Sequence, residues 1–393
     1  MRVLILLEAS GGGAGRHVLD LSLGLAERGL EVHLAYSPLR LAEPFRSGLP
    51  RLREAGVRLL EVPMRRAPHP SDLKALFFLL RYARREGPFH LIHGHSSKGG
   101  ALARFLGLLL GVPVLYTPHG VVTLSPFLKP SERLLYGLME RLMVPLTRLA
   151  IAVSPWEAEA LKALGYRRVE VVPNGVDLRP ASEAERRRAR EALGLSPEER
   201  AVGFVGRLDQ AKDPLLALEA FALLSKELPE ARLLVVGEGP LREEVEEWVA
   251  ALGLSRKVRL LGEREARPIM PALDALLLTS AYEGMPYVLL EALTLGVPVV
   301  SAPTPGLGPW LKEQGLALVS GRSDPEILAQ LLERVLREAP LAEELAERGR
   351  AWIQGWGAER MVETIEALYQ RVAFQKPPLS PRGPSEPQAK VQG

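Results

Sequence analysis

One segment, SAYEGMPYVLLEALTLGVPVV, places two carboxylates on either side of a predicted helix start. Glu283 follows an apolar run that is typical of a strand, and Pro286 suits the first position of a helix. The first backbone N–H groups of that helix, at residues 287–289, would be free to bind an anion. Glu291 lies five residues beyond Pro286, roughly 7.5 Å along the helix axis.

This layout fits a nucleotide sugar, in which a hexose, a diphosphate and a ribose follow in series. Carboxylates at both ends can accept hydrogen bonds from sugar hydroxyls. Glu291 has the apolar neighbours VLL and ALTLG, where an unpartnered carboxylate would be costly, although a solvated helix face is the alternative. The residues of this segment expected to form the site are Glu283, Gly284, Met285, Pro286, Tyr287, Val288 and Glu291.

Two cations lie in a second segment, GFVGRLDQAKDP, which follows another predicted strand. Arg207 and Lys212 are five residues apart on a strand-to-helix loop, so both can approach one anion. A diphosphate is the natural ligand, because arginine offers a planar fork and lysine a point charge. Isolated surface cations remain the alternative.

The glycine-rich segment GGGAGRH follows the first predicted strand. A dinucleotide fingerprint would need a glycine where Arg16 stands and an acidic residue after the second strand, and both are missing. We therefore expect no NAD or FAD. The segment predicts a flexible loop at a helix start that can bind an anion, with Gly12 and Gly13 approaching a phosphate. A tight turn without a ligand is the alternative.

Three histidines, His93, His95 and His119, fall at predicted strand ends, in HGHSSKGG and TPHG. No acidic neighbour completes a zinc ligand set, so we expect no metal. A structural role is favoured for His93. We expect His119, which precedes Gly120 in a predicted turn, to contact a bound hydroxyl or phosphate.

The chain of 393 residues is long enough for two domains, and its composition is that of a globular protein. It contains no cysteine, which excludes disulfides and thiolate chemistry and indicates the cytosol. The apolar run at residues 3–7 predicts a buried strand rather than a signal peptide. No segment approaches the roughly 20 apolar residues that span a bilayer.

Short apolar runs alternate with helical patterns twice, which predicts an α/β protein with two doubly wound parallel sheets that face each other across a cleft. The predicted strands are residues 3–7, 32–36, 57–62, 91–95, 114–117, 150–154, 169–172, 201–205, 232–236, 258–261, 275–279, 297–301 and 317–319. Because ligands bind at the carboxyl ends of parallel strands, the segments above should meet in that cleft. The expected domains are residues 1–177 and 178–352, followed by a helix at 353–374 that crosses back and a disordered tail at 375–393.

The charge is divided unequally between the two halves. Residues 1–177 hold 23 Lys and Arg against 15 Asp and Glu, a net of +8, so the remainder carries −5 of the overall +3. A basic half indicates an anionic partner or simply a solvated arginine-rich surface. Cationic amphipathic segments at 64–85 and 129–148 favour an anionic membrane surface. Nucleic-acid binding is a remote alternative, since no aromatic residues interleave with the cations.

The segments described above, with VSPWEAEAL, VPNGVD and VVGEGP, resemble the retaining GT-B glycosyltransferases of family 4 (glycosyl transferases group 1) up to about Tyr369. The E-x7-E signature of that family matches Glu283 and Glu291. The resemblance implies that Glu291 binds the ribose, that Glu283 and His119 are catalytic and lie near the transferred sugar, and that Arg207 and Lys212 hold the diphosphate. It also implies metal-independent transfer with retention, by front-face displacement.

The expected activity is therefore transfer of a hexose from a nucleotide sugar, UDP-linked rather than GDP-linked, to a lipid-linked or glycan acceptor. It would take place in the cytoplasm, peripherally at the inner membrane face, without a cofactor. A sugar-nucleotide epimerase or hydrolase on the same scaffold is the alternative. Many proteins of that family carry a Gly-Gly turn and a Glu where this chain has TPGLGPWLKEQG, so we expect this chain to differ from them at residues 304–308, without Glu313 as a substitute.

Overall fold

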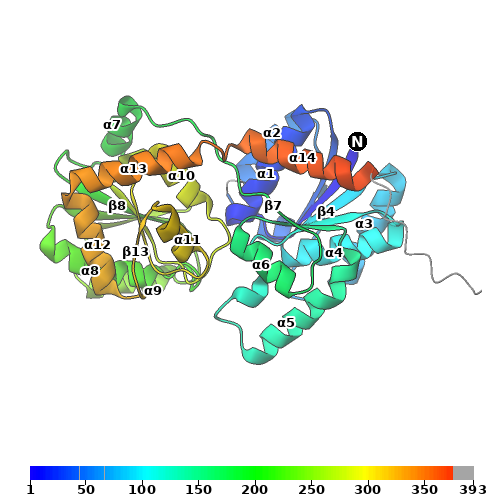
Figure 1. The fold of residues 1–393 in the computed structure, drawn as a ribbon, viewed down its shortest axis with the longest axis horizontal. Helices are drawn as coiled ribbons and strands as arrows, with labels where there is room; N and C mark the ends of the chain where they lie inside the picture. Colours follow the sequence, from blue (N-terminus) through cyan, green and yellow to red (C-terminus); the bar gives the residue numbers. More distant parts are fainter. Residues whose placement is uncertain (44, 66, 375–393) are drawn as a thin grey trace, which may run out of the picture.

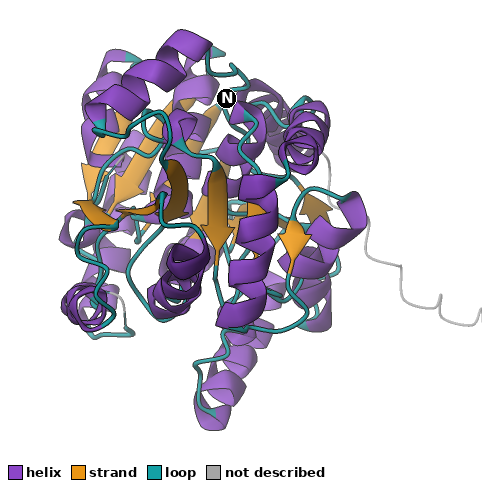
Figure 2. Cartoon of the chain, turned by 90° about the vertical axis from the view of Figure 1, so that its left-hand side faces the viewer, coloured by secondary structure: helices purple, strands orange, loops and turns teal. Residues whose placement is uncertain are grey.

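The computed structural model describes residues 1–43, 45–65 and 67–374. Two parallel β-sheets, each covered by helices, lie side by side along the long axis of the molecule (Figure 1). In the view along that axis, helices lie on either side of the strands (Figure 2). The predicted pair of doubly wound α/β domains is thus confirmed. The predicted tail at 375–393 lies outside the described residues.

The first sheet has seven parallel strands in the order β3-β2-β1-β4-β5-β6-β7. Its strands are β1 (Arg2–Leu7), β2 (Glu31–Tyr36), β3 (Arg58–Glu61), β4 (Leu91–His95), β5 (Val114–Thr117), β6 (Leu149–Ala152) and β7 (Val169–Val171). The central strands β1 and β4 are almost wholly buried, as expected for strands covered on both faces. Every strand predicted in this half is present, with ends shifted by two residues or fewer.

The helices of this domain cover both faces of the sheet. They are α1 (Gly12–Glu27), α2 (Phe45–Glu54), α3 (Ser71–Glu86), α4 (Ser96–Leu110), α5 (Pro130–Met143) and α6 (Pro155–Ala163), with short 3₁₀ turns at Pro38–Arg40 (η1), Val122–Leu124 (η2) and Val144–Leu146 (η3). Most of them bury an apolar face against the strands, but α5 buries only Glu140 and Met143. It projects from the body of the domain (Figure 1).

The second sheet has six parallel strands in the order β10-β9-β8-β11-β12-β13. Its strands are β8 (Arg200–Val205), β9 (Ala231–Val236), β10 (Val258–Gly262), β11 (Ala275–Leu278), β12 (Val299–Ser301) and β13 (Leu318–Val319). Its helices are α7 (Glu183–Ala192), α8 (Pro214–Glu227), α9 (Arg242–Ala251), α10 (Tyr287–Leu295), α11 (Leu307–Gln314), α12 (Pro325–Arg337) and α13 (Ala339–Ile353), with a 3₁₀ turn at Met270–Ala272 (η4). All six strands predicted in this half are present.

The last described helix, α14 (Ala358–Phe374), packs against the first sheet. Its residues Val362, Ile365 and Tyr369 belong to the same apolar cluster as strand β1. Helix α1 approaches it at Gly24, where a Cβ would lie 2.7 Å from Val362, so only glycine permits this contact. The chain therefore crosses between the domains twice, as Figure 1 shows. Among the described helices, none is long and apolar enough to cross a bilayer.

Candidate active site

A cleft of about 980 Å³ opens between the two domains at the carboxyl ends of both sheets. Parallel sheets with this strand order bind ligands at that edge, because the loops that follow the central strands diverge there. Every residue predicted for the site lines it: Gly12, Gly13, His119, Arg207, Lys212, Glu283, Gly284, Met285, Pro286, Tyr287, Val288 and Glu291. The structure thus brings together segments that are up to about 280 positions apart in the sequence.

Lys212 and Glu283 form an ion pair on the wall of the cleft. The same Glu283 oxygen also accepts a hydrogen bond of 2.7 Å from the Ser280 hydroxyl. Lys212 stands just before α8, at the end of a loop that is fixed by the side chain of Asp213, which caps that helix. The ammonium is therefore held at the cleft, neutralised by a carboxylate that a bound anion would have to displace.

Arg207 lies on the same loop and is about half exposed. Its guanidinium donates to Asp209 at 2.9 Å, and the Asp209 carboxylate also accepts from the backbone N–H of Lys212 at 3.2 Å. Asp209 therefore organises both cations. Two cations on one fixed loop can neutralise a diphosphate without a large rearrangement of the backbone.

Helix α10 begins at Tyr287, and Pro286 is its N-cap in an extended conformation. The prediction that Pro286 occupies the first helical position was wrong by one residue. The N–H of Leu289 donates to the Pro286 carbonyl at 3.1 Å, so it is not free as predicted, because the first turn is tight. The N–H groups of Tyr287 and Val288, which precede the first helical bond, remain for an anion.

Glu291 is buried, with 7 % of its surface exposed. Burial raises the pKa of its carboxyl, and the guanidinium of Arg16, 3.9 Å away on the first domain, acts in the opposite direction. Arg16 is itself held by Asp20 at 2.7 Å. Glu291 thus does not lie on a solvated helix face but in the cleft, next to a cation of the opposite domain.

The glycine-rich segment forms the first turns of α1, which begins at Gly12. The expectation of a flexible loop was wrong, because close packing fixes this backbone. A Cβ on Gly15 would lie 1.7 Å from the carbonyl oxygen of Ser10, and one on Gly13 would touch the ring of Tyr287. The first turn of α1 contains no acidic side chain, so its N-terminal end can still face an anion across the cleft.

His119 lies in a tight turn after β5, with a left-handed φ of 55°. The turn is fixed by Glu157, whose two carboxylate oxygens accept from the backbone N–H groups of Gly120 and Val153. Burial raises the pKa of Glu157 to about 7. The His119 Nε2 hydrogen-bonds the Nδ1 of His95 at 2.9 Å, which fixes the direction of its ring.

A third histidine, His17 on α1, completes a cluster in which nitrogens of His17, His95 and His119 lie within 4.8 Å of one another. Burial lowers the pKa of all three, that of His17 to about 4, so they are neutral at pH 7. The His17 ring also hydrogen-bonds Asn174 at 3.0 Å, and the amide of Asn174 donates to the Met285 carbonyl at 2.7 Å. This series of hydrogen bonds connects the first domain to the start of α10.

His93 lies deeper, between the hydroxyls of Tyr369 at 2.6 Å and Thr117 at 2.9 Å. It does not line the cleft. Its contacts tie β4 to α14 and β5, which matches a structural role.

The segment 304–308 does not line the cleft either. Thr304 hydrogen-bonds the Ser280 carbonyl at 2.7 Å, and Gly306 packs against Trp156 of the first domain. Glu313 is exposed on α11 and also lies outside the cleft, so it does not supply a donor contact in place of residues 304–308. Trp156 instead donates to the Glu283 carbonyl at 2.9 Å.

Sequence reasoning missed the residues that position the predicted ones, namely Arg16, His17, Trp156, Glu157, Asn174, Asp209 and Ser280. Each of them is polar or aromatic and lies in one of the sequence segments quoted above. Most of their hydrogen-bond partners are distant in sequence, so residue spacing could not indicate these contacts. The polar residues of VSPWEAEAL and VPNGVD, placed directly after predicted strands, were the one available indication.

Two family models match the chain, one on each domain. Residues 11–179 match "Glycosyltransferase Family 4", and residues 185–352 match "Glycosyl transferases group 1". A UDP-Gal:alpha-D-GlcNAc-diphosphoundecaprenol alpha-1,3-galactosyltransferase of Escherichia coli is 29 % identical over 309 residues, which cover 76 % of this chain and 79 % of that protein. A D-inositol 3-phosphate glycosyltransferase of Corynebacterium urealyticum is 27 % identical, over 95 % of this chain and 93 % of its own.

The fold is similar to that of Anabaena HepE, whose crystal structure holds UDP and glucose. The TM-score is 0.78 at 21 % identity, over 94 % of this chain and 99 % of the other. The crystal structure of WaaG, a glycosyltransferase involved in lipopolysaccharide biosynthesis, gives a TM-score of 0.72 at 19 % identity, over 94 % of this chain and 99 % of that one. With two domain matches, relatives along most of its length and this fold, the chain belongs to the family 4, group 1 glycosyltransferases of the GT-B fold.

Proposed function

We propose that the cleft binds a UDP-hexose and transfers the hexose with retention of its anomeric configuration. The observation that carries the proposal is the series of groups along one wall: the Lys212–Glu283 pair, the start of α10, and buried Glu291. In this arrangement Glu291 accepts from the ribose hydroxyls, while Arg207, Lys212 and the helix start take the diphosphate. Once Lys212 turns from Glu283 to the phosphate, Glu283 can accept hydrogen bonds from the hexose hydroxyls.

The reaction proposed for this geometry is a front-face displacement. The departing diphosphate oxygen accepts the proton of the acceptor hydroxyl, and the acceptor oxygen forms its bond on the face that the diphosphate leaves. Glu283 is a poor nucleophile in this complex, because its carboxylate accepts hydrogen bonds from the Ser280 hydroxyl and from the hexose. The catalytic contribution of the protein is then charge neutralisation on the leaving group by Lys212 and Arg207.

This neutralisation would not require a metal ion, because two side-chain cations and a helix start face the same part of the cleft.

In the histidine cluster, the Nδ1 of His95 and the Nε2 of His119 are hydrogen-bonded to each other. We assign His119 to the hexose, whose hydroxyls its ring can reach from the turn after β5.

The proposed acceptor is a lipid-linked glycan at the cytoplasmic face of the membrane. The Escherichia coli relative is named for transfer onto a diphosphoundecaprenol-linked sugar. In this chain the first-domain side of the cleft is lined by apolar side chains of α3, α4 and α5, including Leu73, Phe105 and Met139, each of which is at least one-third exposed. An apolar approach to the cleft suits an acceptor that arrives on a lipid.

The test is a donor screen followed by product analysis. UDP, GDP and ADP and their hexose forms are added to the purified chain, and the ligand that raises the melting temperature most identifies the donor. Proton NMR then follows the anomeric configuration of the product formed with a lipid-linked acceptor. Stabilisation by UDP ligands with a retained α-linkage supports the proposal. Release of UDP and free sugar without any acceptor would instead indicate the epimerase or hydrolase alternative.

A further inference from the structure

The histidine cluster beside the cleft brings together three segments of the first domain. His17 comes from α1, His95 from the end of β4 and His119 from the turn after β5. The centroids of their rings are 4.7 to 5.5 Å apart, and one nitrogen of each ring lies within 4.8 Å of the other two. In the part of the chain that the structure describes, this is the one group of three histidine or acidic side chains close enough to share a metal ion.

The hydrogen bonds of His17 show which of its nitrogens carries a lone pair. The amide nitrogen of Asn174 donates to the Met285 carbonyl at 2.7 Å, so the amide oxygen is the atom that faces His17. That oxygen can only accept, and the Nδ1 of His17, 3.0 Å away, therefore donates its proton to it. In the neutral ring the Nε2 is then an acceptor, and it is buried without a hydrogen-bond partner among the described residues.

His95 also has a nitrogen to spare. Its Nδ1 faces the Nε2 of His119 at 2.9 Å, and its own Nε2 is buried with no partner in the described protein. A buried polar atom without a partner costs free energy that a ligand can recover. Burial lowers the pKa of all three imidazoles, so protons do not compete for these nitrogens at pH 7. The cluster is thus a set of neutral nitrogen ligands, of which His119 lines the cleft.

The ligand set selects the kind of ion. Imidazole nitrogens bind zinc, copper, nickel and cobalt, whereas magnesium and calcium prefer oxygen ligands. Three histidines that leave a fourth position open are an established arrangement for zinc in proteins. Tetrahedral nitrogens at about 2.1 Å from zinc lie about 3.4 Å apart, so the rings would have to approach by little more than about 1 Å. His119 is partly exposed and can supply this movement.

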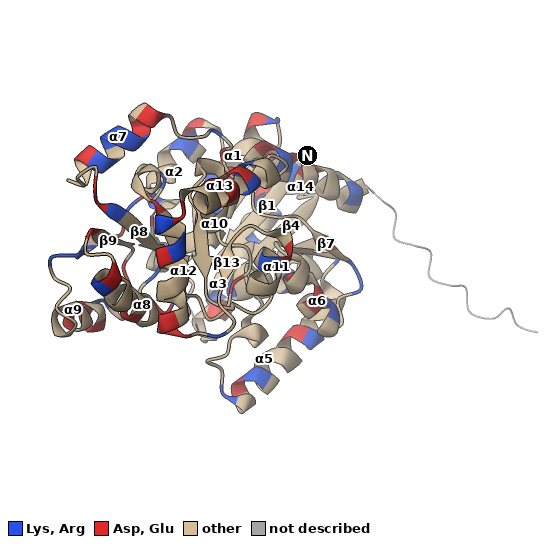
Figure 3. Ribbon diagram, turned by 60° about the vertical axis from the view of Figure 1, so that its left-hand side comes forward, with Lys and Arg blue, Asp and Glu red and all other residues tan. Residues whose placement is uncertain are grey.

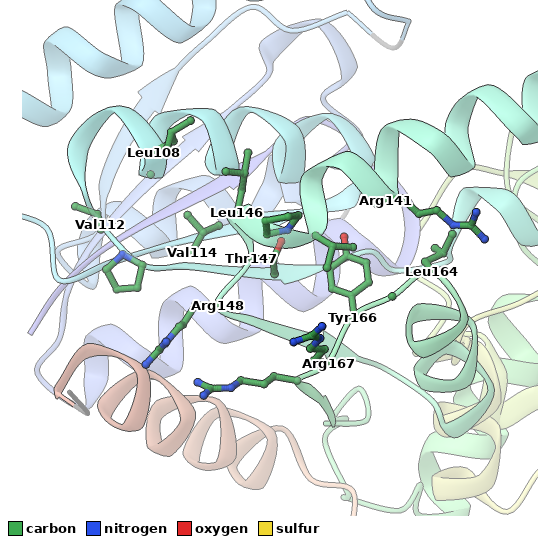
Figure 4. A pocket seen from close by; sticks show the side chains of 16 residues that line it. Leu108, Val112, Val114, Arg141, Leu146, Thr147, Arg148, Leu164, Tyr166 and Arg167 are labelled. Atoms are coloured by element: carbon green, nitrogen blue, oxygen red, sulfur yellow. The ribbon is translucent and has the colours of Figure 1, made fainter. Parts of the chain in front are cut away.

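Other charged regions of the molecule are less suited to a divalent cation. Helix α7 carries dense bands of both charges in Figure 3, and its carboxylates Glu185 and Glu191 already have arginine partners. A second cavity, of about 810 Å³, lies on the first domain at the amino ends of β5 and β6. It is lined by arginines, among them Arg141, Arg148 and Arg167 (Figure 4), and would repel a cation. The neutral histidine cluster presents neither obstacle.

We propose that His17, His95 and His119 bind a divalent transition-metal ion such as Zn²⁺, and that the bound ion inhibits transfer of the hexose. The ion coordinates the free Nε2 of His17 and replaces the hydrogen bond between His95 and His119, whose proton moves to the other nitrogen of its ring. The three histidines considered in the sequence have no acidic neighbour and predict no metal; His17 replaces His93 as the third ligand. The inhibition rests on the proposed contact of His119 with the hexose, whereas binding of the ion does not.

The first test measures binding of Zn²⁺ and Co²⁺ to the full chain, purified without a histidine tag and treated with a chelator. Calorimetry should show one zinc ion per chain, and Co²⁺ should give the visible absorption of a site with nitrogen ligands. His17→Gln should bind zinc at least about 100-fold more weakly, because loss of a ligand exceeds the roughly ten- to 100-fold loss caused by changing a second-shell partner. His69→Gln, the same substitution at an exposed histidine outside the cleft, should bind as the wild type does.

A second variant covers the case in which His17→Gln does not fold. His119→Asn removes the ligand at the cleft, and asparagine tolerates the left-handed φ of that turn. It should lose zinc binding to the same extent. Wild-type affinity for zinc in the folded variants overturns the metal site.

The second test measures hexose transfer from a UDP-hexose in large excess over the metal, so that chelation by the diphosphate does not deplete the donor. Zn²⁺ should inhibit the wild type at the concentration at which it binds, and Mg²⁺ should not. Inhibition of His17→Gln, relative to its own metal-free rate, should require at least about 100-fold more zinc. An unchanged rate with zinc bound overturns the inhibition. Zinc binding by a chain that transfers no hexose would refute the proposed function and leave the metal site standing.

Discussion

Replacing Glu283 by glutamine should strengthen the binding of UDP while it weakens the transfer of sugar. In the free protein Lys212 is paired with Glu283, so a diphosphate must compete for the ammonium. Glutamine keeps the size of the side chain and can still accept from Ser280, but it releases the lysine. The two effects have opposite signs, which a general loss of structure cannot produce.

The expected change in UDP affinity follows from the solvent exposure of the Lys212–Glu283 ion pair. The side chain of Lys212 is 25 % exposed and that of Glu283 is 13 % exposed, so solvent screens their attraction only in part. A contribution of about 1 kcal/mol, at the upper end for surface pairs, corresponds to UDP binding about five-fold more tightly in Glu283→Gln. Transfer should fall by at least ten-fold, because a neutral amide accepts more weakly from the hexose hydroxyls than a carboxylate.

Isothermal titration with UDP and a coupled assay of transfer measure the two quantities on the same preparation. Asp209→Asn is the comparison variant: it removes a carboxylate of the same loop that pairs with the Arg207 guanidinium and accepts from the backbone N–H of Lys212, but it leaves the Lys212 ammonium paired with Glu283. UDP affinity in Glu283→Gln that is equal to or weaker than that of the wild type would refute the competition between carboxylate and diphosphate. Unchanged transfer would refute the assignment of Glu283 to the hexose.

Three further predictions concern groups around the cleft. Glu291→Ala should weaken UDP binding about 30-fold, because a buried charged acceptor is lost; titration should show that the variant no longer prefers UDP over an analogue without the ribose hydroxyls. Burial raises the pKa of Glu157 from 4.5 to about 7, so the folded protein binds this proton more tightly and its stability falls as the pH rises through that window. In urea unfolding, the stability of the wild type relative to Glu157→Gln should therefore decrease by about 3 kcal/mol between pH 4.5 and 7, and an equal difference at both pH values would contradict this origin. Gly15→Ala should lower the melting temperature and abolish UDP binding, since its Cβ would meet the Ser10 carbonyl, while Gly321→Ala, in open space and without a positive φ, should retain UDP binding.

The sequence predicted the strands well because parallel strands covered on both faces leave a simple pattern. Runs such as VLILL and LLVV are continuous and apolar, and polar turn residues separate them from the helices. The rule that ligands bind at strand ends then brought His119, Lys212 and Glu283 to one cleft without any knowledge of their distances. The errors at Pro286 and at the glycine-rich segment concern single turns, where packing rather than composition decides the helix start.

The contacts that the sequence could not predict are those between the domains. Three polar contacts join the segment from Glu283 to Glu291 to the first domain: Trp156 donates to the Glu283 carbonyl, Asn174 donates to the Met285 carbonyl, and Arg16 faces Glu291. Two of these hydrogen bonds are accepted by backbone carbonyls, which every residue type provides. No side-chain pattern in the segment can therefore predict them.

These contacts change how the donor site is understood. The start of α10 is fixed partly by residues of the opposite domain, and the same chain of bonds continues through His17 to the histidine cluster beside His119. A change in the angle between the domains would therefore move the diphosphate site and the hexose side together. In the proposed function the acceptor enters between the same domains, so its arrival and the positioning of the donor would act on one shared set of hydrogen bonds. The site is thus a property of this two-domain arrangement, and neither domain alone would hold it in this geometry.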